Sequence, residues 1–541
     1  MLIPITVAVM LFAVQAADHQ HQHAQPGAEK LGTVKFPTSC SDAAQPPFLR
    51  GMTLLHSFEF GAAIDSFKAA AAADPSCGIA HWGVALGAWS NPFAAGIKPV
   101  PALQAGRDAI AKAKDAGAKT ERERAFIDAA ARLFADFETV DQRTRVLAYR
   151  DAMQQVSSRF PDDPEAKAFY ALALASSQDP ADMTYANLLA AGKILETLAP
   201  TEPDHPGFVH YIIHAYDAPP LAGRALDAAR RYAKIAPDAP HALHMPSHTF
   251  TRLGYWQDSI DTNIASAEAA RRVKVPGEEM HAMDYQTYAY LQLAQDASAR
   301  KVVDALPDVR QRFLAPGAAS GAAPPLAAAY ASAAIPARYA LERGAWADAA
   351  RLQPPGSSFI NAEAITWFAK AIGAARMEPK DLAAARAAIA MLEQIAGKLA
   401  QTKEMYWAEQ VTIQRLGASA WLALAEGRKD EALSFMREAA DREDKIEKNA
   451  VTPGPIAPAR EQLGEMLLAL NQPGPALAAF ETTLKKEPNR YRALAGAVEA
   501  ERRLKKGTGT GAHADALLAL TAKADGPVRP EIAALKAGAK R

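Results

Sequence analysis

Residues 204–217 read DHPGFVHYIIHAYD, and residues 238–251 read DAPHALHMPSHTFT. A shift of 34 residues superposes the first stretch on the second. The matched residues include the acidic pair Asp204 and Asp238, the prolines Pro206 and Pro240, and two histidine pairs, His210 with His244 and His214 with His248. A repeat of this length is typical of helix-turn-helix units that bury their apolar faces by stacking on their neighbours. We therefore expect a stack of helical hairpins.

The repeat carries an unusual number of histidines. The chain has 13 histidines, and seven of them fall in residues 204–284: His205, His210, His214, His241, His244, His248 and His281. Histidines four positions apart lie on one face of a helix, so each copy presents two imidazoles to the same side. Neighbouring helices lie about 8–10 Å apart, a gap that a metal with His nitrogens at about 2.0–2.1 Å can bridge when the side chains converge.

The composition and the net charge limit which fold classes and which kinds of binding partner are expected. The 541 residues include 60 Lys+Arg and 60 Asp+Glu, so electrostatics give no reason to expect nucleic acid or an anionic membrane as partner. Alanine-rich stretches such as Ala69–Ala73 and Ala383–Ala390, with little Val/Ile alternation, favour an all-α protein. No segment after the first residues is apolar enough to span a bilayer.

The N-terminus has the pattern of a secretory signal. Residues 1–16 contain an apolar run from Ile3 to Val14 and end in Val14-Gln15-Ala16, which is typical of a cleavage site, although a basic start is missing. We therefore expect a periplasmic or secreted protein. The histidine-containing lead, residues 17–43, would begin Ala17-Asp18-His19 after cleavage, and a free amine with such a histidine suits Cu(II) or Ni(II).

Two cysteines, Cys40 and Cys77, are present. An even count in an oxidising compartment predicts one disulfide. Because there is no C-x-x-C motif, we interpret the pair as a structural bridge between the N-terminal segment and the second helix pair.

Two further stretches show the helix-pair pattern most clearly. Residues 47–75 place small, aromatic and proline residues at regular positions, as do residues 457–488. The residues concerned are Gly51, Ala63, Phe67 and Pro75 in the first stretch and Leu463, Gly464, Leu467, Ala476, Phe480 and Pro488 in the second. These positions resemble the consensus of the tetratricopeptide repeat (TPR) family, which implies an all-α, TPR-like solenoid of helical hairpins wound as a right-handed superhelix.

The resemblance covers most of residues 44–505. We expect an N-terminal solenoid over 44–313 that carries the histidines, an Ala/Gly/Pro-rich linker, a second solenoid over 326–505, and a flexible tail with short helices over 506–541. In TPR proteins, positions two, five, nine and twelve of the first helix line the concave ligand-binding surface. The resemblance places there, or next to it, His205, His210, His214, Asp217, His241, His244, His248, His281 and Asp284.

Several blocks further resemble a group of exported bacterial TPR proteins of uncharacterised function. The blocks are His205-Pro206-Gly207, His210-Tyr211, His214-Ala215-Tyr216-Asp217, residues 239–248, Thr38-Ser39-Cys40 and Val451–Pro455. Such a resemblance implies a fold and no reaction. No nucleophile elbow, P-loop, dinucleotide fingerprint or H-E-x-x-H helix occurs, so the sequence assigns no catalytic residue and favours a binding protein over an enzyme.

Three interpretations of the histidines remain open: a metal site, a hydrogen-bonding pocket for an anionic ligand or peptide, and buried structural histidines. For the metal site the sequence selects His210, His214, His244 and His248, a set that suits Zn, Cu, Ni or Fe. Binding should weaken as pH falls through about 6.5. His56, His81 and His513 are expected to take no part, and the alternative function is a protein or peptide scaffold without metal.

Pro246 lies inside the second histidine repeat. A proline within a helix removes a backbone hydrogen bond. We therefore expect either that a helix begins at Pro246, with His241–Met245 as a turn before it, or that the helix kinks between His244 and His248.

Overall fold

The computed structural model describes residues 29–94, 96–318, 321–504 and 511–538. The proposed signal, residues 1–16, and the histidines His19, His21 and His23 lie outside the described residues. The first helices are α1 (Gln45–His56), α2 (Phe60–Ala73), α3 (Gly78–Trp89), α4 (Val100–Ala116), α5 (Glu121–Ala131), α6 (Gln142–Arg159), α7 (Pro164–Ser176) and α8 (Ala186–Leu198). The histidine-bearing region contains α9 (Pro206–Ala215), the 3-10 helix η1 (Ala222–Ala225), α10 (Leu226–Ile235), α11 (Pro240–His244), α12 (Pro246–Arg252), α13 (Trp256–Arg272) and α14 (Pro276–Gln292).

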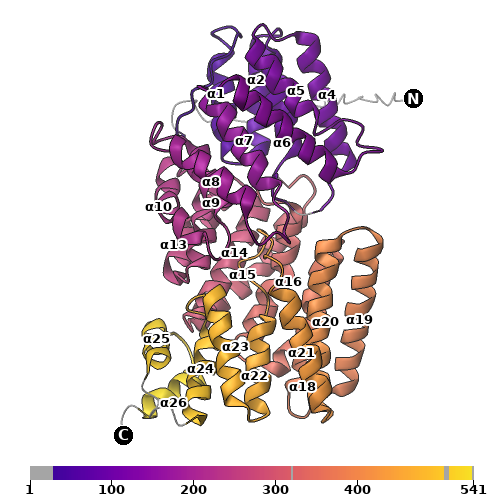
Figure 1. The fold of residues 1–541 in the computed structure, drawn as a ribbon, viewed down its shortest axis with the longest axis vertical. Helices are drawn as coiled ribbons and strands as arrows, with labels where there is room; N and C mark the ends of the chain where they lie inside the picture. Colours follow the sequence, from indigo (N-terminus) through magenta and orange to yellow (C-terminus); the bar gives the residue numbers. More distant parts are fainter. Residues whose placement is uncertain (1–28, 95, 319–320, 505–510, 539–541) are drawn as a thin grey trace, which may run out of the picture.

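The C-terminal half is also helical. Its helices are α15 (Asp296–Leu314), α16 (Pro325–Leu341), α17 (Trp346–Arg351), α18 (Ile360–Arg376), α19 (Leu382–Gln401), α20 (Met405–Ala425), α21 (Lys429–Glu443), α22 (Ala459–Ala469), α23 (Pro473–Lys486), α24 (Tyr491–Arg503), α25 (Ala512–Leu520) and α26 (Pro530–Gly538). Within the described ranges no strand forms, and one isolated bridge pairs Gln295 with Asp525. Successive helices pack on one another along an elongated molecule (Figure 1). The protein is therefore an all-α, TPR-like solenoid of helical hairpins.

A phenylalanine packed between two glycines holds the hairpins together at both ends of the solenoid. Phe67 of α2 is fully buried, and a Cβ atom added at Gly51 of α1 or at Gly83 of α3 would lie 2.8 or 2.6 Å from its ring. Phe480 of α23 lies in the same way between Gly464 of α22 and Gly496 of α24. Because the glycines have no side chain, the helices can approach the ring closely on both sides.

The segment before α1 runs across the starts of both histidine repeats. The backbone N–H of Thr33 donates to the carbonyl of Asp204 (3.0 Å), and the N–H of Asp238 donates to the carbonyl of Lys30 (3.4 Å). Gly32 adopts a left-handed φ of 82° where the chain passes the Asp204 carbonyl, a conformation that favours glycine. The two aspartates matched by the 34-residue shift therefore bind the same segment.

At the C-terminal end, the short helices α25 and α26 pack against the body of the solenoid. The Arg529 guanidinium bonds Asp296 at 2.6 Å, and Leu517 and Ile532 are buried with residues of α24. None of the helices in the described part of the chain has the length and apolar composition that crossing a bilayer requires.

A disulfide joins Cys40, in the segment before α1, to Cys77 at the start of α3. Replacing both cysteines by serine should lower the free energy of unfolding by about 3–4 kcal/mol, because the bridge restricts a loop of 37 residues in the unfolded chain. Denaturant unfolding of the two proteins measures the difference. Thiol labelling of unreduced wild-type protein should find no reactive group, and an equal stability of both proteins would contradict a structural role.

Pro246 divides the second histidine repeat into two helices. The helix α11 ends at His244, and α12 begins at Pro246, with Met245 between them in helical conformation (φ −55°, ψ −35°). A proline at the first position of a helix loses no intrahelical hydrogen bond, so the break is compatible with an ordered chain. A helix does start at Pro246, but the preceding residues 240–244 form a helix of their own instead of the turn expected for that alternative.

Candidate functional site

The start of α9 fixes the direction of the first histidine pair. His205 caps the helix, and its Nδ1 accepts a hydrogen bond from the N–H of Gly207 (3.1 Å), while Pro206 occupies the first helical position. One turn later, His210 and His214 extend from the same face of α9. The cap and the proline therefore set the register from which both imidazoles point inward.

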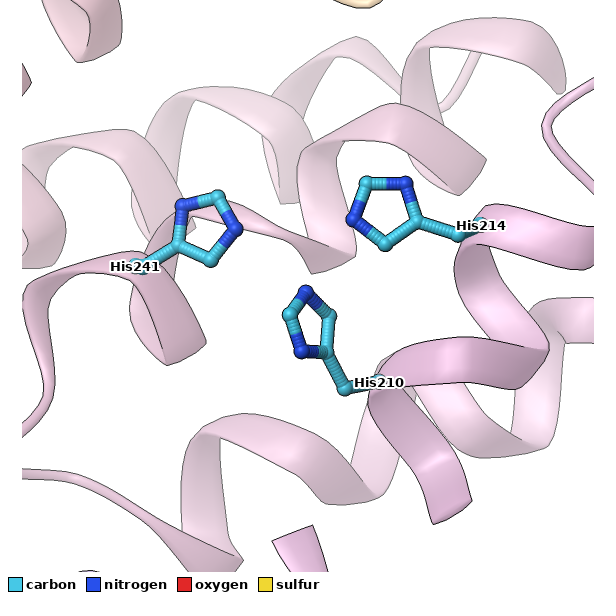
Figure 2. Close-up of side chains that lie close together, drawn as sticks. All are labelled: His210, His214 and His241. Atoms are coloured by element: carbon cyan, nitrogen blue, oxygen red, sulfur yellow. The ribbon is translucent and has the colours of Figure 1, made fainter. Parts of the chain in front are cut away.

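His210 and His214 meet His241 of α11 in what we call the first histidine triad. One nitrogen from each of the three rings lies within 4.8 Å of the others, and Figure 2 shows the three rings facing a common space. The centroid of the His210 ring lies 4.8 Å from that of His214 and 5.1 Å from that of His241. Aromatic rings enclose the triad, with Phe93 stacked on His214 at 4.0 Å and Phe58 against His210 at 4.4 Å.

The first triad contains several buried nitrogens without a hydrogen-bond partner among the described residues. His210 Nδ1 donates to the backbone carbonyl of His56 at 2.6 Å, so its Nε2 carries the lone pair. Four buried nitrogens have no hydrogen-bond partner among the described residues: the Nε2 atoms of His210 and His214 and both ring nitrogens of His241. Buried polar groups are almost always hydrogen-bonded. Three imidazoles with unsatisfied nitrogens at one point therefore indicate a place where a bound ion or ordered water satisfies them.

Two buried carboxyl groups lie beside the first triad and form no salt bridge with a lysine or arginine of the described chain. Glu278 Oε1 lies 3.7 Å from His241 Nδ1, and Glu59 Oε1 accepts the backbone N–H of His241 at 3.2 Å. Burial raises the pKa of Glu278 to about 7, and burial together with Glu278 raises the pKa of Glu59 to about 8. Buried carboxylates normally have a cation nearby, and a metal held by the triad would supply one.

The second histidine triad consists of His244 of α11, His248 of α12 and His281 of α14. Nitrogens of these three rings again lie within 4.8 Å of one another. His248 Nδ1 donates to the Asp217 carboxylate at 2.9 Å. His244 Nδ1 lies 2.7 Å from Oδ1 of Asn263, and that amide is oriented by its own N–H, which donates to the carbonyl of Ser259 at 2.7 Å.

These partners determine which nitrogens carry hydrogen. A carboxylate and an amide oxygen only accept, so His248 and His244 are both protonated at Nδ1 and carry lone pairs at Nε2. The two Nε2 atoms nevertheless face each other at 3.1 Å. Two lone pairs at this separation repel unless a cation lies between them. Two nitrogens bound to one tetrahedral ion at about 2.0–2.1 Å lie about 3.3–3.4 Å apart, close to the separation in the structure.

Protonation is an unfavourable way to supply that cation. All six imidazoles of the two triads are buried, with at most 6% of each residue exposed. Burial lowers the pKa of His210 and of His281 to about 3. Burial also lowers the pKa of the other four histidines, His214, His241, His244 and His248. For His248, this effect outweighs the opposing effect of Asp217. The neutral form that binds metal ions is therefore the stable form of all six at neutral pH.

A third group, His56, Glu165 and His205, is geometrically similar and chemically different. Both imidazoles bond the Glu165 carboxylate at 3.0 Å through Nε2. The remaining nitrogens are also satisfied, since His56 Nδ1 accepts from the hydroxyl of Tyr211 (2.9 Å) and His205 Nδ1 caps α9. Every ring nitrogen has a partner, so we interpret this group as structural. It holds α1, α7 and α9 together, and the His56 carbonyl orients His210.

Gly207 provides a test of this arrangement. A Cβ atom at this position would lie 2.3 Å from His56 Nδ1, so Gly207→Ala should displace the His56 ring and cost about 1–3 kcal/mol of stability. The control is Gly397→Ala in α19, where an added Cβ meets nothing within 4 Å and should raise stability by about 0.5–1 kcal/mol. Thermal unfolding measures both variants, and equal stabilities would contradict the interpretation.

The structure places the nine residues that the sequence selected in four different environments. Six of them form the two triads. The four proposed metal ligands are divided between these triads: His210 and His214 join His241, and His244 and His248 join His281. Asp217 supports His248. His205 lies in the structural group, and Asp284 lies outside both triads, where Arg338 bonds it at 2.9 Å.

The three histidines that were expected to take no part in metal binding, His56, His81 and His513, differ in their roles. His56, through its carbonyl, positions His210. His81 is partly exposed on α3, and His513 bonds Glu501 at 2.7 Å on the surface. The histidines do share one side, as the repeat predicts. That side is covered by Phe58, by Phe93 and by the segment Val451–Pro455, whose Thr452 carbonyl lies 3.2 Å from the Tyr285 hydroxyl next to His248.

Several residues that contact the triad histidines were not predicted from the sequence. Asn263 had a detectable signal, because the 34-residue shift matches it to Ala229, a buried alanine on the second helix of the preceding repeat. A polar residue at a position that is apolar in the neighbouring copy indicates a polar partner across the helix pair. Glu59 and Glu278 had no such signal, because their proximity to His241 depends on contacts between helices far apart in the chain.

No protein-family model and no curated protein matches the chain. Solved structures that are similar to it include the human IFIT1 dimer with m7Gppp-AAAA, at 9% identity and a TM-score of 0.36, over 83% of this chain and 89% of that chain. The TPR domain of P58(IPK) is 12% identical with a TM-score of 0.22, over 86% of this chain and 98% of that chain. Cut9–Hcn1 of the APC/C is 10% identical with a TM-score of 0.31, over 92% of this chain and 90% of that chain. Because these TM-scores are low, the fold assignment rests on this chain's own hairpins.

Proposed function

We propose that the protein is a TPR-like scaffold whose two buried histidine triads bind transition-metal ions. The observation that carries this proposal is the pair of Nε2 atoms of His244 and His248, which face each other at 3.1 Å although oxygen acceptors occupy the Nδ1 side of both rings. The partnerless nitrogens of the first triad support it independently. Imidazole ligands suit Zn, Cu, Ni and Fe, and three of them with one open position suit zinc or copper best.

The surroundings of the second triad have the form that metal sites in proteins commonly take. A ligating histidine usually donates its other N–H to a carboxylate or a carbonyl, which fixes the ring and raises its basicity. Asp217 and the Asn263 side chain act in this way on His248 and His244. In the first triad the His56 carbonyl does the same for His210. The residues that determine the ring orientations are thus built into the fold.

Elemental analysis of protein purified without an affinity tag tests the proposal. We expect at least one equivalent of a transition metal per chain, or uptake of Zn or Cu to that level when the metal-free protein is titrated. Metal below stoichiometric amounts that does not increase on adding Zn or Cu would refute the proposal.

Metal binding should persist to a lower pH than an exposed histidine site allows. Protons compete with the metal for neutral imidazole. Because burial lowers the pKa of His210 and His281 to about 3, this competition begins below the ordinary value of about 6.5. A pH titration of the loaded protein with a colorimetric chelator should place half-release below that value. A solvent-exposed His-x-x-x-His peptide is the control, and a midpoint at or above 6.5 would contradict the expectation.

A second candidate function is that of a scaffold that binds a peptide or an organic ligand without metal. A cleft that is partly open to solvent lies between α20 and the segment 448–457. Aromatic side chains line it, and the indole N–H of the buried Trp407 has no hydrogen-bond partner among the described residues. If the elemental analysis finds no metal and no uptake, this function remains.

We also propose that the protein is exported to the periplasm or secreted. The support for this proposal is the Cys40–Cys77 disulfide, because such bridges persist in oxidising compartments and are rare in the cytosol. Cell fractionation with detection of the oxidised and reduced forms tests it, and a reduced cytosolic protein would overturn it.

A further inference from the structure

The two histidine triads lie as close to each other as the members of one triad do. His241 and His244, three residues apart on α11, belong to different triads, and their ring centroids lie 6.0 Å apart. His214 and His248, which connect the triads on the other side, lie 6.1 Å apart. Within the triads the corresponding distances reach 6.5 Å, between His214 and His241. Metal ions held by the two triads would therefore be immediate neighbours.

A single ion cannot use all six imidazoles in this arrangement. Nitrogens bound to one ion at about 2.0–2.1 Å lie at most about 4.2 Å apart. The nitrogens form two groups, each of them compact to within 4.8 Å, and no group of described residues unites the six. Each triad supplies three nitrogens, so a four-coordinate ion in either triad has one position left for a further ligand.

The remaining ligand is not supplied by the surrounding carboxyl groups. Within the described chain, the sets of ligand atoms that meet at the two triads contain histidine nitrogens only. Asp217 is already bound to His248, Arg252 and Lys448, and Asp284 is bound to Arg338. Glu278 lies 3.7 Å from His241, but that same oxygen accepts the backbone N–H of Ala323 at 2.6 Å. Two divalent ions with six neutral ligands in a buried site also require negative charge nearby. Glu59 and Glu278 can supply part of it beside the first triad, whereas Asp217, beside the second triad, is neutralised by Arg252 and Lys448. A small anionic ligand from solvent meets both needs.

We infer that the two triads form one binuclear metal centre, whose two ions share a small oxygen-donor ligand such as hydroxide at their open positions. The inference rests on the proposed metal binding and adds the number of ions, their proximity and the class of ligand. Burial of all six histidines excludes large ligands. Two-metal sites of this kind hold their ions about 3.5–4 Å apart, a distance that one bridging oxygen spans.

Loading the full-length metal-free protein with Cu(II) tests the inference. Copper per chain is measured by elemental analysis, and unpaired electrons are counted by integrating the electron paramagnetic resonance (EPR) spectrum. We expect two copper ions per chain and an integrated signal close to zero, because a shared oxygen ligand couples the two electrons. Azide, added as a probe, should compete for the bridging position and change the optical spectrum.

The variants His210→Ala and His281→Ala form a matched pair, since each removes one ligand from a different triad. Each should lower the copper content to one ion and restore one full spin per chain, while circular dichroism of the metal-free variants checks that they fold. For the wild-type protein, two ions with two full spins, or one ion per chain, would overturn the binuclear centre and leave metal binding intact. Absence of bound copper would refute the proposed function itself, so the two failures are distinguishable.

Discussion

Replacing His244 by alanine should lower the metal affinity of the second triad by a factor of about 100 or more. The imidazole of His244 is one of three ligands, and loss of a supporting partner alone costs about 10–100-fold in metal proteins. Its nitrogen faces His248 at 3.1 Å. The first triad does not contain His244, so it should keep its ion, and the copper or zinc content should fall by half.

Competition titration with a chromophoric chelator measures this effect. His81→Ala is the control, because His81 is partly exposed on α3 and belongs to none of the three groups. It should change neither the stoichiometry nor the affinity. If His244→Ala binds both ions as tightly as the wild-type protein, the second triad is a structural cluster of histidines.

Replacing Asp217 by asparagine should destabilise the protein by about 3–5 kcal/mol, because it leaves the buried Lys448 without its partner and leaves Arg252 paired with Glu447 alone. The Asp217 carboxylate bonds Arg252 at 2.8 Å and Lys448 at 3.4 Å, across 231 residues of sequence in the second case. Burial acts to raise the pKa of Asp217, but Lys448 and Arg252 hold it well below its ordinary value. Burial lowers the pKa of Lys448 to about 8.

A double-mutant cycle separates this network from general packing effects. Lys448→Met alone should cost less than Asp217→Asn, since Arg252 still neutralises the carboxylate. The double variant should be more stable than the sum of the two single effects predicts, because it removes a charge of each sign. Denaturant unfolding of the metal-free proteins measures the cycle, and strict additivity would show that Asp217 and Lys448 do not interact energetically.

The position of Asp217 links the scaffold to the candidate metal centre. One of its oxygens accepts from His248 and the other from Arg252, and Arg252 lies one turn after His248 on α12. Lys448 comes from the segment before Val451–Pro455, which covers the second triad. The loss of Asp217 should therefore also weaken metal binding, by about 10–100-fold. Metal binding should therefore depend on contacts between the two halves of the solenoid.

The sequence alone determined the repeat and the side of each helix that carries the histidines. The 34-residue shift, and the glycine and phenylalanine positions around Phe67 and Phe480, are local patterns that specify hairpin packing wherever they occur. The spacing of His210 and His214 puts both on one face because the helix period is a local property. Those features were predictable, since no distant residue is needed to produce them.

Only the tertiary structure decided which histidines belong together. His241 and His244 lie on the same short helix, yet they join different triads, because the helix ends before Pro246 and α14 brings His281 next to His244. The carboxyl groups of Glu59 and Glu278 and the Asp217–Lys448 pair come from segments far apart in the chain. Their meeting depends on how the hairpins curve and which segments cover the inner face, and a residue pattern within one repeat does not encode either.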